Sequence, residues 1–165
     1  MFSWFKKKPQ RSAAEEAAHQ KGKEAATAFT ESFDAYFAQR FDPVLADYLN
    51  VLRDGLRDTL TNVSAPPIIL ARVEYSNFLA ETTLLKEKVL EEIAVAMARW
   101  FEVADAMGTR EEFQRYIDYR VNDKMNLLPM EGLSVLTQAV SYLKPADDEY
   151  RARYPDKSKE FPPPA

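Results

Sequence analysis

The chain has no cysteine, only four glycines and a single histidine, His19, in 165 residues. The lack of cysteine excludes disulfide frameworks, thiol nucleophiles and thiolate metal sites, and it is typical of a reducing compartment, so we expect a cytoplasmic protein. A serine or threonine nucleophile needs a positioned base, and one histidine offers almost none. Four scattered glycines do not form a phosphate-binding loop. These absences predict a protein that is not an enzyme.

Metal ligands are also scarce in any usable pattern. No Glu-x-x-His pair is present, which argues against a di-iron bundle. Glu102 and Asp105 stand three residues apart, but glutamates elsewhere in the same predicted helix alternate with lysines, as on an ordinary solvated face. We expect neither a metal nor a cofactor.

Positive charge is concentrated at one end of the chain. The net charge is −4, yet residues 1–12 contain four basic residues and no acid, so the remaining residues carry 18 basic against 26 acidic side chains. A body of net charge −8 is unsuited to neutralising phosphates, so we expect no nucleic-acid partner.

Long apolar runs and strand-like alternation are absent as well. No run approaches the ~20 apolar residues of a membrane-spanning helix. Apolar residues instead recur at intervals of three and four, which predicts an all-α fold. We expect an elongated antiparallel helical hairpin or bundle with two long helices and two or three shorter C-terminal helices. The expected units are an aromatic and basic segment (1–12), one helical domain (13–154) and a proline-rich charged tail (155–165).

A proline interrupts the first long helix without ending its apolar stripe. Pro43 follows Asp42, a good capping residue, while the apolar phase continues on both sides. This predicts a kinked or closely restarted helix whose arms cover 13–41 and 43–62. Ser64 is expected to cap the next helix, with the two prolines that follow it in the first turn.

The second long helix is expected over 68–107. Gly108 suits its left-handed end, and Thr109 opens a capping-box sequence that starts a third helix. Pro129 is expected to separate the third helix from a fourth, which Pro145 closes. The later helices are therefore predicted to be short.

The first eight residues combine large apolar side chains with consecutive cations. Aromatic rings favour the boundary between lipid headgroups and acyl chains, and each cation near an anionic leaflet contributes roughly 1 kcal/mol. We expect this segment to contact the inner face of a membrane or a partner protein, and the alternative is a segment with neither role. The residues concerned are Phe2, Trp4, Phe5, Lys6, Lys7 and Lys8.

Aromatic side chains also recur at helical spacing inside the body. Such a row provides either the packed core, which is the more common use, or a face for a partner or an apolar ligand. The residues of this aromatic row are Phe29, Phe33, Tyr36, Phe37 and Phe41, together with Trp100 from the second long helix.

The sequence is most consistent with a helical adaptor or assembly subunit. Catalytic groups are nearly absent, while helical surface is abundant for a chain of this mass. We expect protein partners, with a homo-oligomer and an anionic membrane surface as further possibilities. The alternative is a monomeric helical bundle that binds a small apolar ligand or a client peptide in the aromatic row, as a sensor or a secretion chaperone does.

Overall fold

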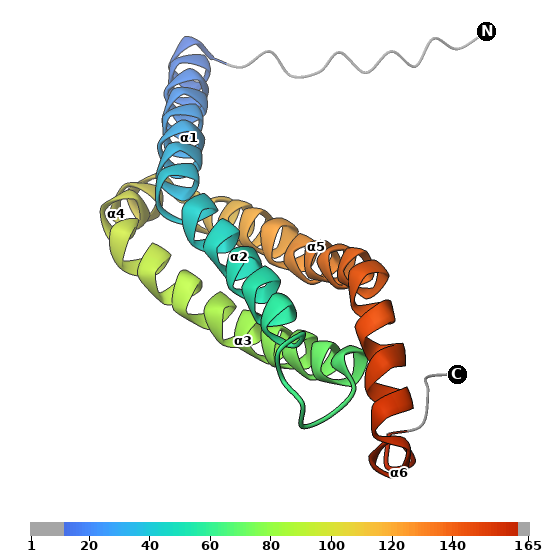
Figure 1. Cartoon of the computed structure of the whole chain (residues 1–165). Coiled ribbons are helices and arrows are strands. Elements are labelled where there is room, and N and C mark those ends of the chain that lie inside the picture. The colour runs from blue at the N-terminus through green and yellow to red at the C-terminus, as the bar shows by residue number, and fades with distance from the viewer. Residues whose placement is uncertain (1–11, 162–165) are drawn as a thin grey trace, which may run out of the picture.

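The protein is an all-α bundle, as predicted, in a computed structural model that describes residues 12–161. No strand is present in that part of the chain. Figure 1 shows the arrangement of the helices. In order along the chain they are α1 (Ala13–Arg40), α2 (Asp42–Asp58), α3 (Pro67–Ala96), α4 (Ala98–Met107), α5 (Arg110–Arg153) and α6 (Pro155–Ser158).

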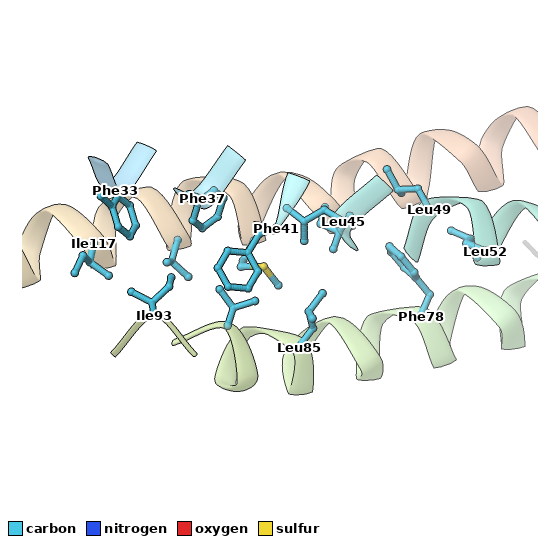
Figure 2. Packing of buried hydrophobic residues seen from close by; sticks show 14 of the residues in the cluster. Phe33, Phe37, Phe41, Leu45, Leu49, Leu52, Phe78, Leu85, Ile93 and Ile117 are labelled. Carbon is cyan, nitrogen blue, oxygen red and sulfur yellow. The ribbon is translucent and has the colours of Figure 1, made fainter. Parts of the chain in front are cut away.

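The first two helices form one long bent helix, and this confirms the expected restart near Pro43. Phe41 ends α1 and precedes α2, with its N–H donating to Phe37 O at 2.8 Å and its carbonyl accepting from the N–H of Leu45 at 2.9 Å. The bend keeps one buried face across both arms. In Figure 2, Phe37, Phe41 and Leu45 point into the same interior.

The second long helix is broken where no break was expected. Met97, with ψ near 5°, separates α3 from α4. Neither glycine nor proline marks this position. The one-residue break turns α4 so that Phe101 and Ala104 are buried at the end of the bundle. Tertiary packing therefore overrides a continuous helical pattern here.

The predicted breaks at Pro129 and Pro145 are wrong, because α5 continues through both. A proline inside a helix removes one hydrogen bond and costs ~3 kcal/mol, so packing must offset that cost. Next to Pro129, Leu128 is buried, and the hydroxyl of Tyr75 in α3 donates to the Pro129 carbonyl at 3.1 Å. Figure 1 shows α5 changing direction ahead of its red C-terminal turns.

Two expected caps also differ from the structure. Thr109 makes no side-chain cap for α5; its N–H donates to Ala104 O at 2.9 Å, so it completes the end of α4 after the left-handed Gly108. Ser64 does not cap α3 either, because the helix begins at Pro67 and a side chain of α5 accepts the N–H of Ile68.

The core runs along the middle of the bundle between α2, α3 and α5. Polar contacts fix α3 and α5 as antiparallel neighbours, because Ile68 bonds Asp147 near one end and Lys86 bonds Asn122 further along. Large side chains from α1 and α2 close the core from above α3 in Figure 2. The residues labelled there include Phe33, Leu49, Leu52, Phe78, Leu85, Ile93 and Ile117, all of them buried.

The N-terminal part of α1 extends from this core without burying side chains. No residue of 13–28 is buried, and Phe29 is the first that is. We call residues 13–28 the stalk, and at 1.5 Å per residue it is about 24 Å long. Ser12 and Glu15 form a capping box that holds the start of the stalk in helical form.

Candidate functional site

The aromatic row lies inside the bundle. Phe29, Phe33, Phe37 and Phe41 are each at most 2% exposed. Phe29 stacks on Phe113 of α5 with ring centroids 4.0 Å apart. The four phenylalanines therefore pack the core, which is the more common of the two uses weighed for the row.

The other two members of the row lie at the edge of the core. Trp100 of α4 meets the edge of the Phe29 ring at 5.8 Å and is half-buried. Tyr36 is half-buried too, and burial together with the nearby Glu92 carboxylate raises its pKa. Residues 1–8, including the six proposed contact residues, lie outside the part of the chain that the structure describes.

A polar cluster beside the row fastens α1 to α5. The hydroxyl of Tyr116 donates to Asp34 at 2.9 Å, and Arg120 Nε donates to the same carboxylate at 3.0 Å. Burial and the bond to Asp34 raise the pKa of Tyr116. All three residues are half-buried and satisfied by one another, so the cluster positions helices and leaves no group free for chemistry.

A hollow of about 670 Å³, open to solvent on one side, lies between the start of α3 and the C-terminal half of α5. We call it the α3/α5 groove. Helix α2 lies on another side of α5, where Leu45 and Leu49 approach Leu128. The groove is lined by Ile68, Arg72, Leu136, Thr137, Val140, Lys144, Asp147, Asp148 and Arg151.

The floor of the α3/α5 groove is apolar. Ile68 is 8% exposed, whereas Leu136 and Val140 are half-buried and pack against the core from outside. Leu133, one turn earlier on α5, is 50% exposed. A half-exposed apolar strip of this kind is typical of a surface that another element covers.

A buried carboxylate holds the end of the groove together. Asp147 is 4% exposed, accepts the N–H of Ile68 at 3.0 Å and pairs with Arg151 Nε at 2.7 Å. The N–H groups in the first turn of a helix lack partners within the helix and favour an anion. Asp147 therefore caps α3 from α5, and its charge is fully used inside the chain.

The cations of the groove are less completely used. In residues 12–161, Arg72 has no carboxylate oxygen within 4.0 Å. Lys144 pairs with Asp148, but both side chains are 58% exposed, so the pair is weak. Arg151 also donates from Nη1 to the Phe161 carbonyl at 2.8 Å, while its Nη2 has no acceptor in the described part of the chain.

The expected charged tail is partly folded against this end. Residues Pro155–Ser158 form α6, and Phe161 is held by its bond to Arg151. Residues 162–165 lie outside the described part of the chain.

The described residues contain no cluster of three or more potential metal ligands, and none of their helices has the length and apolar character needed to cross a bilayer. Asp105, one of the two carboxylates considered for a metal, pairs with Arg110. Comparisons with protein-family models, curated proteins and solved structures gave no match to this chain.

The α3/α5 groove was not among the sites predicted from the sequence. The signal was present as a second stripe on α5, displaced from the buried one, in which Val140, Lys144, Asp147 and Arg151 follow at intervals of four, three and four. The expected break at Pro145 divided this stripe between two elements. With that break, the stripe falls on two separate predicted helices and does not form one face.

Proposed function

We propose that the protein is a non-enzymatic helical adaptor that works at the inner face of a membrane. In this proposal residues 1–8 contact an anionic membrane surface, and the bundle carries a binding surface for another protein. The observation that carries it is the stalk, a capped helix of about 24 Å that buries none of its own side chains.

The stalk has no stripe of large apolar residues and meets the bundle lightly, where Gly22 lies beside Met107 of α4, so it contributes little to the core. The aromatic and lysine-rich residues 1–8 precede the stalk in the sequence. Three aromatic rings and three lysines supply both attractions that hold a peptide at an anionic bilayer surface.

The alternative, an apolar ligand inside the aromatic row, is not favoured by the packing. Phe29, Phe33 and Phe37 contact one another and the rings of Tyr116 and Phe113 at stacking and edge distances. A ligand there would have to displace core side chains.

Co-sedimentation with vesicles tests the membrane contact. The full chain is mixed with phosphatidylcholine vesicles that contain from none to about 30% phosphatidylglycerol, in steps of about 10%. Only the anionic charge of the vesicles is varied in this series. Replacing Lys6, Lys7 and Lys8 by glutamate is expected to weaken binding to the anionic vesicles by about 100-fold or more, from roughly 1 kcal/mol per cation.

The control is Lys21→Glu with Lys23→Glu, which lowers the net charge by four, against six in the test variant, and leaves residues 1–8 intact. This control is expected to bind nearly as the unaltered chain does. If a chain that lacks residues 1–8 sediments with anionic vesicles as well as the full chain does, the proposed membrane contact is refuted.

A further inference from the structure

We propose that the α3/α5 groove binds an amphipathic helix from a partner protein. The apolar stripe of that helix covers Leu136 and Val140, and its acidic flank meets Arg72 and Lys144. This inference deepens the proposed adaptor function, on which it rests, by naming the surface and the chemistry of the partner.

The shape of the site suits a helix. Two antiparallel helices, α3 and α5, form its walls, and an amphipathic helix in an apolar groove is a recurring mode of recognition. On another side of α5, the chain's own helix α2 already packs in this way through Leu45 and Leu49. From Leu136 to Arg151 the α5 wall of the groove is about 22 Å long at 1.5 Å per residue, which corresponds to about four turns of an occupying helix.

The charge of the site selects the partner. The chain outside residues 1–12 has a net charge of −8, yet the groove carries Arg72, Lys144 and Arg151 against Asp147 and Asp148. Asp147 and Arg151 pair with each other and bond Ile68 and Phe161, and Lys144 pairs only weakly with Asp148. Arg72 and Lys144 are therefore the cations open to an occupant, against Asp148 alone. Carboxylates on the flank of an incoming helix would pair with the cations of the rim.

Arg151 supports the same choice. Its Nη2 is buried and has no acceptor in residues 12–161, whereas its Nε and Nη1 are both bonded. An unpaired buried donor is costly, and an acceptor from an occupant can remove that cost only once the Arg151 side chain, which is 19% exposed, turns its Nη2 toward the groove. A basic helix would instead add repulsion at Arg72 and Lys144.

Designed peptides provide the probe. Three 18-residue helical peptides are compared: one with a leucine stripe at intervals of three and four and glutamates on its flanks, one with lysines in place of those glutamates, and one with the leucines distributed around the helix. Fluorescence anisotropy with the full chain is expected to give a Kd of about 10–100 μM for the first peptide and at least about tenfold weaker binding for the other two.

A charge-reversal pair makes the test specific to the groove. Arg72→Glu with Lys144→Glu is expected to weaken binding of the glutamate-flanked peptide by about tenfold and to strengthen binding of the lysine-flanked peptide. The matched control, Arg53→Glu with Lys88→Glu, makes the same change in net charge at exposed positions of α2 and α3 that lie outside the groove. It is expected to change neither affinity by more than about twofold.

Nuclear magnetic resonance of the ¹⁵N-labelled full chain locates the peptide. Shift changes centred on residues 68–72 and 133–151 support the proposal, and changes centred elsewhere overturn it. Equal affinity for the two flank types also overturns it, as does the absence of binding by all three peptides.

Two other occupants have their own signatures. Sedimentation that shows a dimer of the unaltered chain, dissociated by the Arg72 and Lys144 reversal, means that a second copy fills the groove and overturns the proposal. Peptide binding that appears only after residues 162–165 are removed assigns the groove to the chain's own C-terminus and overturns it too. If the unaltered chain binds the glutamate-flanked peptide but does not bind anionic vesicles, only the proposed membrane contact is refuted.

Discussion

The contact between α3 and α5 at Gly132 allows a sharp test of the packing. Gly132 is buried within α5 and faces the ring of Phe78 in α3. A methyl group at Gly132 would lie 3.0 Å from Cδ1 and Cζ of that ring and closer still to Cε1. Phe78 is only 4% exposed, so its ring cannot move into solvent.

Two opposing terms set the expected effect of Gly132→Ala. Alanine is more favourable than glycine inside a helix by about 1 kcal/mol. Overpacking a well-filled core costs about 1–3 kcal/mol. The free energy of unfolding should therefore fall by about 1 kcal/mol, which lowers the Tm by about 2–4 °C for a domain of this size.

Gly55→Ala is the matched control. Gly55 lies inside α2, and a methyl group there would meet the Glu74 side chain, whose nearest atom, Oε2, lies at 3.2 Å and is the far end of a flexible side chain. The free energy of unfolding of this variant should rise by up to about 1 kcal/mol, because alanine is more favourable than glycine inside a helix. Urea unfolding followed by circular dichroism measures both variants, with unchanged slopes as the check that the compared states are the same.

The refuting result is a Gly132→Ala protein that is stabilised as much as Gly55→Ala. That outcome would mean that α5 does not approach Phe78 as described, and the register of α3 against α5 would be wrong. A smaller side chain at position 78 makes the test more specific. Phe78→Leu combined with Gly132→Ala should lower the free energy of unfolding by less than the sum of the two single changes.

Three further predictions follow from polar contacts. Asp147→Ala should lower the free energy of unfolding by about 2–4 kcal/mol, because it leaves the Ile68 N–H and the Arg151 guanidinium unpaired; faster amide exchange at Ile68 checks it. The pKa of Tyr116 is raised, so its bond to Asp34 stabilises the fold below pH ~10, and this contribution is lost as the pH rises further. Above pH ~10 the free energy of unfolding should therefore fall less steeply with pH in Tyr116→Phe than in the unaltered chain. Ser12→Ala should cost the stalk about 1 kcal/mol, seen as faster exchange at its first amides with global unfolding unchanged.

Much of the helical architecture could be predicted from local patterns. The spacing of Phe29, Phe33, Phe37 and Phe41 identifies one buried face, and that face is indeed continuous across the bend before Pro43. Gly108 adopts the left-handed conformation expected of a helix end. These features depend on residues close together in the chain, so the sequence contains the information needed to place them.

Features decided by distant contacts could not be predicted in this way. Pro129 indicates a break locally, but α5 continues through it, with Leu128 buried beside it and Tyr75 of α3 bonded to its carbonyl. The sequence around Met97 contains no residue that breaks a helix. The helix is interrupted there because α4 folds over the end of the core. Both helices must be placed before Arg72 of α3 and Lys144 of α5 can be recognised as lining the same groove.

The stalk has an electrostatic consequence for the whole molecule. An anionic surface repels a body of charge −8, and that repulsion decays with a Debye length of about 8 Å at physiological ionic strength. The stalk length of about 24 Å is three such lengths, over which the repulsion falls to roughly one twentieth. The first buried turn of α1 can therefore lie outside the repulsive field of the surface that residues 1–8 are proposed to touch. Shortening the stalk by two turns would return the acidic bundle to that field.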